Sequence, residues 1–337
     1  MATQYLNLDP AYYIRPDTFE AERRRIFWRS WQFLGPASAV GELGQYLSAD
    51  IAGLGVVAIR GKDGALRAFK NVCRHRGARI LEVGQGKCGL MVCPYHKWSY
   101  SDTGALVQAP WFGKDPAIIP EDWPLDAVSV DIWRGLVFAA VDPEESLPDQ
   151  LGDLVDELAD EPLESYIATD SASVTFDANW KVYTDNFVEG YHIPGTHPSF
   201  YAAIDFDAFE TTAHKGFVRM TAPPKDGLFY RGKWLWMWPN WTLSLFNGGM
   251  NTSRINPVSV ERTEQLYNFY FADTSAAAEP ARQRTIEGNL AVVREDYTVC
   301  TTTHRNYAAG VYSPGPLSSR HEKGVHYFQS RVRQALG

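Results

Sequence analysis

The spacing of apolar and polar residues changes along the chain, and at the N-terminus it predicts a helix. In segment 17–31 the apolar positions recur at helical spacing, and Asp17 is expected to cap the helix. These apolar positions are Phe19, Ile26, Phe27 and Trp31. The pattern of segment 41–143 predicts short strands, with a hairpin turn at Asp63-Gly64. The pattern therefore predicts a helix followed by a β-rich region.

Helical and strand patterns share the rest of the chain. The expected elements are a helix at 147–160 with Pro148 in its first turn, a helix around 180–192, a β-rich stretch at 213–271, and helices near 279–300 and 322–335. Apolar residues run almost without a break through 262–271, which suits a strand buried on both faces. The sequence thus predicts an α+β fold. A small all-β domain, 41–145, is inserted into a larger domain, an antiparallel sheet flanked by helices, built from 1–40 and 146–337.

Composition and charge narrow the classes of function. The 337 residues are 45% hydrophobic and 21% charged, as in ordinary globular proteins, and the net charge of −8 argues against a nucleic-acid or anionic-membrane partner. We see neither an apolar leader nor an apolar run near the roughly 20 residues of a membrane helix, so a cytoplasmic protein with no membrane partner is expected. Four cysteines are too few for a disulfide scaffold, and their clustering points to a metal.

The first cluster of candidate ligands consists of two Cys–His pairs. Cys73-x-His75 and Cys93-x-x-His96 are separated by residues 76–92. Two thiolates and two imidazoles suit tetrahedral zinc, or a two-iron, two-sulfur cluster in which two histidines replace two cysteines on one iron. Zinc fingers usually keep like ligands together, whereas here each pair supplies one Cys and one His, which favours the cluster.

These residues resemble the Rieske iron–sulfur family, whose pattern is C-x-H followed by C-P-Y-H and a Trp two places on. The second part reads Cys93-Pro94-Tyr95-His96 here, with Trp98 beyond it. The resemblance implies that Cys73, His75, Cys93 and His96 bind a [2Fe-2S] cluster. The family usually has Gly where this chain has Lys97, and a cation there would favour the reduced cluster. Cys88 falls outside the pattern and is expected to pack as a small apolar residue.

A second cluster of candidate ligands changes the interpretation from electron carrier to enzyme. His192 and His197 would point about 140° apart on a continuous helix, but Pro194 and Gly195 are expected to break the helix and bring them together. Two histidines with carboxylates nearby are typical of a 2-His-1-carboxylate iron site with open positions for oxygen. The string "NWK…DNF…E-x-YH-x₄-H" also resembles the catalytic domain of Rieske non-haem iron oxygenases. The resemblance makes His192 and His197 iron ligands.

The third ligand is expected from a late helix that carries Glu295-Asp296. The family's acidic ligand is the Asp of such a pair, which implies Asp296. Asp296 also falls beside the predicted apolar face of this helix, where a carboxylate without a metal would be costly. The apolar positions are Leu290, Val293, Tyr297 and Cys300. Members of the family often carry Gln where this chain has His304, so the resemblance does not predict how the pocket wall near His304 is built.

The resemblance also assigns catalytic roles to residues before His192. Glu189 matches the carboxylate that bridges the two metal centres, between His192 and the residue corresponding to His96 on a neighbouring subunit. A homotrimer is thereby implied. Asp185 and Asn186 are further catalytic candidates, although helix-end solvation explains Asp185 equally well.

The implied activity is that of a terminal oxygenase that uses dioxygen and a mononuclear Fe(II). Electrons would come from NAD(P)H through a separate reductase or ferredoxin, because no G-x-G-x-x-G fingerprint follows a strand here. A Rieske ferredoxin would lack 179–200 and 294–300, and a structural zinc protein would be colourless.

The small-molecule substrate remains open between two classes. Aromatic residues crowd segment 229–241 and could hold a quaternary ammonium by cation–π attraction, stack on an aromatic compound, or simply fill the core. They are Phe229, Tyr230, Trp234, Trp236, Trp238 and Trp241. Glu189 and the likeness of the C-terminal half to choline and betaine monooxygenases favour hydroxylation or N-demethylation of an N-methylammonium compound. The alternative is hydroxylation of an aromatic ring or side chain.

Overall fold

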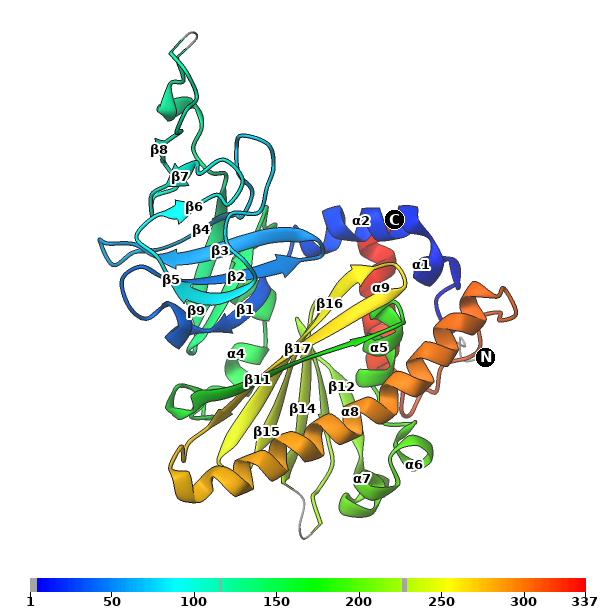
Figure 1. Cartoon of the computed structure of the whole chain (residues 1–337). Coiled ribbons are helices and arrows are strands. Elements are labelled where there is room, and N and C mark those ends of the chain that lie inside the picture. Colours follow the sequence, from blue (N-terminus) through cyan, green and yellow to red (C-terminus); the bar gives the residue numbers. More distant parts are fainter. Residues whose placement is uncertain (1–4, 115–116, 226–228) are drawn as a thin grey trace. The chain divides into compact units, whose positions relative to one another are not determined.

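The computed structural model describes residues 5–114, 117–225 and 229–337, and the chain divides into two compact units (Figure 1). One unit is Phe27–Leu147, and the other combines Met1–Ile26 with Pro148–Gly337. We describe each unit by itself. In the described part of the chain, no helix is both long enough and apolar enough to cross a membrane.

The smaller unit is built on antiparallel strands. Its seven-stranded sheet has the order β1-β10-β9-β4-β3-β2-β5, and a three-stranded sheet has the order β6-β7-β8. The strands are β1 (Gln32–Pro36), β2 (Gln45–Ile51), β3 (Leu54–Arg60), β4 (Leu66–Lys70), β5 (Gly84–Lys87), β6 (Met91–Val92), β7 (Ser99–Tyr100), β8 (Leu106–Gln108), β9 (Ala127–Trp133) and β10 (Leu136–Ala140). The predicted hairpin is confirmed, because β3 pairs with β4 across a turn in which Gly64 has φ +80°.

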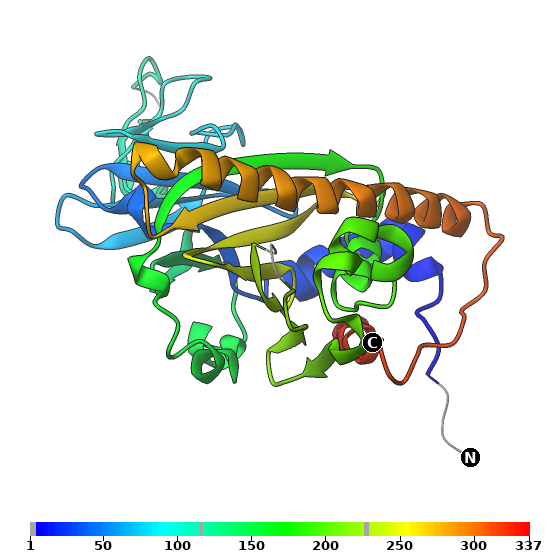
Figure 2. The same ribbon diagram turned by 90° about the horizontal axis from the view of Figure 1, so that it is seen from below.

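The larger unit is one antiparallel sheet with helices packed against it. Its seven strands have the order β11-β17-β16-β15-β14-β13-β12. They are β11 (Ile167–Phe176), β12 (Glu210–Ala213), β13 (Phe217–Thr221), β14 (Tyr230–Met237), β15 (Trp241–Phe246), β16 (Gly249–Ser259) and β17 (Arg262–Phe271). The long helix α8 (Glu279–Ala308) runs along this sheet (Figures 1 and 2). The predicted α+β class, with an antiparallel sheet flanked by helices, is confirmed.

The remaining helices are short, apart from one at the C-terminus. They are α1 (Ala11–Ile14), α2 (Pro16–Glu22), α3 (Leu147–Leu151), α4 (Leu154–Glu157), α5 (Trp180–Phe187), α6 (Ile193–Thr196), α7 (Pro198–Ala203) and α9 (Lys323–Leu336). Helix α5 packs against both α8 and α9. A buried ion pair anchors α5, because Lys181 Nζ contacts a carboxylate oxygen of Glu22 on α2, and both side chains are fully buried.

Several predicted boundaries were wrong. Asp17 does not cap α2, because it lies in the first turn and accepts a hydrogen bond from Arg15 Nε at 2.9 Å. The helix predicted at 147–160 is split into α3 and α4 at Gly152, whose φ of +56° cannot continue a helix. Strand β17 is buried on both faces only at Phe269–Phe271, since buried and half-buried residues alternate before them.

Candidate metal centres and active site

Two tight loops in the smaller unit carry the predicted cluster ligands. Cys73 and His75 follow β4, whereas Cys93 and His96 lie between β6 and β7. Each cysteine is held by backbone hydrogen bonds: the Cys73 N–H donates to Ala78 at 2.8 Å, and the Cys93 N–H donates to the Trp98 carbonyl at 2.8 Å. Both thiols are therefore fixed at the tips of loops that rest on the unit's core.

The four side chains fit a [2Fe-2S] cluster. The imidazoles of His75 and His96 lie 4.5 Å apart between ring centroids, and the side chains of Cys73 and Cys93 are buried. The Nδ1 atoms of both histidines are buried and have no hydrogen-bond partner within the described residues. Buried polar atoms without partners are rare and call for a ligand. Two thiols and two orphaned imidazole nitrogens supply the donor set of a Rieske cluster.

Neighbouring residues shape these loops. The Tyr100 hydroxyl lies 3.4 Å from Cys73 Sγ and accepts the Arg74 N–H at 3.0 Å, which ties the first loop to β7. Lys97 has φ +61°, a left-handed backbone that glycine adopts without strain, so the departure from the family's Gly carries a cost here. Cys88 is half-buried against the hydrophobic core, as expected.

In the larger unit, the two histidines predicted to bind iron lie on a chain reversal after α5. The helix ends at Phe187, whereas we predicted it to reach 192 and to break at Pro194-Gly195. Beyond the helix end, the backbone at Gly190 passes close to Phe209, where a β-carbon would lie 2.4 Å from the ring. Pro194 and Gly195 instead form the short helix α6 between His192 and His197.

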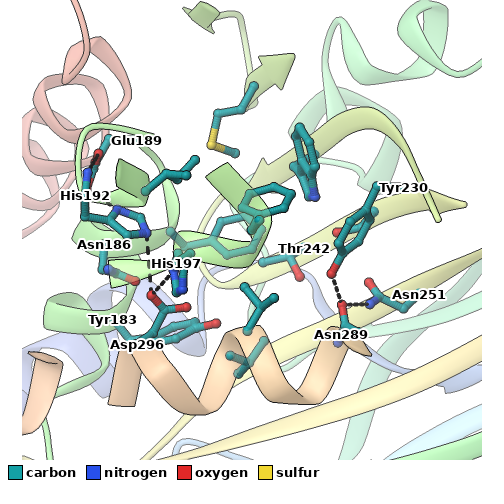
Figure 3. A pocket seen from close by; sticks show the side chains of 18 of the residues that line it. Tyr183, Asn186, Glu189, His192, His197, Tyr230, Thr242, Asn251, Asn289 and Asp296 are labelled. Atoms are coloured by element: carbon teal, nitrogen blue, oxygen red, sulfur yellow. Dashed lines mark hydrogen bonds and ion pairs between the residues drawn. The ribbon is translucent and has the colours of Figure 1, made fainter. Parts of the chain in front are cut away.

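His192, His197 and Asp296 come together at one point. One ligand atom from each lies within 4.8 Å of the others (Figure 3). Asp296 Oδ1 is 2.8 Å from His197 Nε2 and 3.5 Å from His192 Nε2. Asp296 is only 7% exposed on the inner face of α8, so its carboxylate is held where a metal ion would offset the cost of burial.

Carboxylates also lie on the far side of both rings. His192 Nδ1 is 2.6 Å from Glu189 Oε1, and His197 Nδ1 is 2.6 Å from Glu295 Oε2. A carboxylate accepts the Nδ1 proton and so fixes the tautomer that leaves Nε2 free to bind a metal. The contact of Glu295 was missed in the sequence, although the Glu-Asp pair marked its position.

Asp185 and Asn186 have different surroundings. Asn186 lines the pocket beside the three candidate ligands, whereas Asp185 does not line it. Its carboxylate accepts hydrogen bonds from the Tyr13 hydroxyl at 2.6 Å and from Gln329 Nε2 at 3.0 Å. Burial raises the pKa of Asp185 to about 7, against the effect of these two donors. Asp185 thus links the N-terminal segment, α5 and α9, and its catalytic role stays a prediction.

The pocket that contains these three candidate ligands is largely apolar and aromatic. It encloses about 650 Å³ of empty space, including its open mouth. Phe200, Tyr230 and Trp234 line one wall with their rings edge to face, at centroid distances of 5.4–5.9 Å. Trp236 and Trp238 pack instead against Phe328 of α9, so the aromatic segment serves both the pocket and the core. His304 is buried on α8 and does not line this pocket.

Fold and site together define a Rieske-type non-haem iron oxygenase, an oxidoreductase that uses dioxygen. Residues 163–337 match the family described as the ring hydroxylating alpha subunit (catalytic domain), and residues 30–121 match the Rieske [2Fe-2S] domain. The chain belongs to the ring hydroxylating alpha subunit family. Its cofactors are accordingly a [2Fe-2S] cluster and a mononuclear non-haem iron, and its electrons come from a separate donor protein, as throughout this family.

Relatives include enzymes that act on quaternary ammonium compounds. The carnitine monooxygenase oxygenase subunit of Escherichia coli is 30% identical over 80% of this chain and 75% of its own length. Choline monooxygenase of Spinacia oleracea is 26% identical over 97% of this chain and 77% of its own. The solved structure of the quaternary ammonium Rieske monooxygenase CntA with L-carnitine superposes with a TM-score of 0.88, at 27% identity, over 99% of this chain and 96% of CntA. Naphthalene 1,2-dioxygenase, at 21% identity and a TM-score of 0.85, covers 98% of this chain and 92% of its own and shares the fold.

Proposed function

We propose that this chain is the terminal oxygenase subunit that hydroxylates or oxidatively N-demethylates a small quaternary or N-methyl ammonium compound. The aromatic wall of Phe200, Tyr230 and Trp234 beside the three ligands carries this proposal. Aromatic faces attract an ammonium group by about 0.5–2 kcal/mol, depending on its desolvation. The relatives named for choline and carnitine support the same class of substrate.

In this proposal His192, His197 and Asp296 hold the iron, and Cys73, His75, Cys93 and His96 hold the cluster. The iron, when bound, supplies the activation of dioxygen. The residues around it keep the site in one state: Glu189 and Glu295 accept the Nδ1 protons of the two histidines, so that both Nε2 atoms stay unprotonated. The apolar wall limits access of water to the centre.

Glu189 is also proposed to connect the two metal centres across a subunit boundary in a homotrimer. Its Oε2 accepts the backbone N–H groups of Tyr191 and His192, which fixes the carboxylate beside the imidazole. A structure of the related quaternary ammonium monooxygenase is described with inter-subunit electron transfer, which supports this arrangement. The cytoplasmic location expected from the sequence also stays a prediction.

Hydroxylation of an aromatic compound is the second candidate function. Its support is the apolar part of the pocket, where Ile193, Phe209, Met220 and Val293 could pack against a flat hydrocarbon. The fold shared with naphthalene 1,2-dioxygenase is compatible with this function without favouring it.

Substrate-coupled dioxygen uptake separates the two functions. The cluster- and iron-loaded protein is supplied with electrons by a surrogate reductase and offered N-methylated amines and aromatic hydrocarbons. We expect uptake and formaldehyde or hydroxylated product only with amines. Trp234→Leu should raise the KM for an ammonium substrate about tenfold, and Trp234→Phe, which keeps a ring, much less. Turnover of aromatic compounds alone would overturn the proposal.

A further inference from the structure

The end of the pocket remote from the three ligands holds a small polar cluster formed by Tyr230, Asn251 and Asn289. The Tyr230 hydroxyl lies 2.5 Å from Asn289 Oδ1, and Asn251 Nδ2 donates to the same oxygen at 2.8 Å (Figure 3). Burial raises the pKa of Tyr230, so its hydroxyl keeps the proton that it donates. All three side chains line the pocket and are almost fully buried.

This arrangement leaves one hydrogen-bond donor unused. Both donors of the cluster are directed at Asn289 Oδ1, whereas Asn289 Nδ2 is buried without a partner among the described residues. Asn289 is only 3% exposed, so bulk water does not compensate for the missing bond. Native structures rarely leave a buried amide N–H unpaired, because its desolvation is not repaid. An acceptor on a bound molecule would satisfy it.

The charges of the pocket restrict what that acceptor can be. The described residues that line the pocket include the carboxylates of Glu189 and Asp296 but no lysine or arginine. A carboxylate on the ligand would therefore be buried without a counter-ion, next to a neutral amide and a neutral phenol. A hydroxyl, ether, carbonyl or amide oxygen accepts the same N–H without that cost.

Helix α8 fixes the distance between the polar cluster of Tyr230, Asn251 and Asn289 and the metal ligands. Asn289 and Asp296 are seven residues apart on α8, which places them on one face about 10 Å apart along the axis. A ligand whose reacting carbon lies near His192, His197 and Asp296 can therefore present an oxygen to Asn289. This requires that the reacting carbon and the oxygen are a few bonds apart.

We propose that Asn289 Nδ2 binds an uncharged oxygen acceptor at the far end of the substrate, and that the pocket discriminates against a free carboxylate there. This inference rests on the proposed oxidation of an ammonium compound and narrows its substrates. They are N-methylated amines that carry an alcohol, ether, carbonyl or amide function, in preference to zwitterionic amino acids.

Calorimetric titration of the cluster- and iron-loaded protein tests the inference under anaerobic conditions, where no turnover occurs. Three probes share one trimethylammonium chain: γ-butyrobetaine, its primary amide, and an alkyl analogue with an isopropyl group in place of the carboxamide. We expect the amide to bind about three- to tenfold more tightly than the alkyl analogue, the yield of one neutral hydrogen bond. The affinity for the amide should also exceed the affinity for γ-butyrobetaine by about tenfold or more.

Two variants assign the preference to Asn289. Asn289 Oδ1 accepts hydrogen bonds from Tyr230 and Asn251, so Asn289→Leu is combined with Tyr230→Phe and Asn251→Leu to leave no unpaired donor in the polar cluster. In this triple variant the amide and the alkyl analogue should bind with equal affinity. Tyr230→Phe combined with Asn251→Leu is the matched control: it keeps Asn289 Nδ2 in place, so the preference for the amide should persist. Should the triple variant not fold, the comparison of the three probes on the unaltered protein still decides the charge preference.

The outcomes distinguish this inference from the proposed function. Binding of γ-butyrobetaine as tight as that of its amide, or an unchanged amide preference in the triple variant, would overturn the inference and leave the ammonium assignment standing. Binding of aromatic compounds alone would overturn the ammonium assignment. In that case a preference for benzamide over benzoate would support the role of Asn289, and the reverse preference would refute it.

Discussion

Removal of the carboxylate behind His197 should weaken iron binding without disturbing the cluster. Glu295 Oε2 lies 2.6 Å from His197 Nδ1, and the next residue, Asp296, contacts Nε2 of the same ring at 2.8 Å. Glu295→Gln keeps an acceptor oxygen but loses the charge, whereas Glu295→Ala loses both. The ring can then rotate or take the other tautomer, which would remove the lone pair at Nε2 from the metal.

The size of the effect follows from the exposure of the two partners. The ring of His197 is 2% exposed, but the side chain of Glu295 is 46% exposed, so solvent screens its charge. Hydrogen bonds to charged groups contribute about 1.5–3 kcal/mol, and the screened bond here belongs at the lower end. We therefore expect Glu295→Ala to lower the affinity for Fe(II) about tenfold, and Glu295→Gln about threefold.

Competition between the protein and a chelator for Fe(II), in the absence of oxygen, measures this affinity directly. Glu287→Gln is the matched control, since Glu287 is an exposed residue on the same helix and should leave the affinity unchanged. The visible spectrum of the [2Fe-2S] cluster should be the same in all variants. Iron affinity that stays the same in Glu295→Ala would show that packing alone orients His197, and our reasoning would be refuted.

Three further predictions concern other parts of the chain. Asp296→Ala should abolish substrate-coupled dioxygen uptake and leave the cluster spectrum intact, and full activity would rule out Asp296 as the third ligand. Lys97→Gly should stabilise the chain by about 1 kcal/mol in urea unfolding, because φ is +61° there, and should lower the cluster's reduction potential by removing a positive charge; an unchanged potential would exclude the charge effect. Glu22→Ala should destabilise the chain by about 3–5 kcal/mol, because it leaves Lys181 buried without its counter-ion, and Glu22→Leu combined with Lys181→Met should restore most of the loss. Equal stability of the single and double variants in urea would contradict this account.

Much of the fold could be predicted because apolar periodicity is a local property. The antiparallel strands and the helix that became α8 follow the pattern, although α8 extends to Ala308 rather than 300. The end of α5 could not be predicted in this way. The chain just beyond it passes close to Phe209 at Gly190, a contact between segments that local periodicity does not describe.

The same distinction applies to the candidate site, where some residues are marked by local motifs and others are brought together only by the fold. The two Cys–His pairs, His192, His197 and Asp296 were found because family motifs mark them in the sequence. The polar cluster was not found, since its members are joined only by the fold: Asn251 and Tyr230 are 38 and 59 residues from Asn289. No motif marks Asn251 or Asn289, and Tyr230 stood out only as one aromatic residue of segment 229–241.

The aromatic strand β14 shows why periodicity could not decide between pocket and core. Trp234 and Trp236 are two residues apart in the strand, so they lie on the same face of the sheet. Trp236 meets Phe328 of α9, whereas Trp234 meets Phe200 of α7 and the cavity. The alternation specifies the face, and the helix that covers each position specifies its role. Because Asp296 and Asn289 line the same pocket and both lie on α8, the spacing between them is set by a rigid helix rather than by a loop.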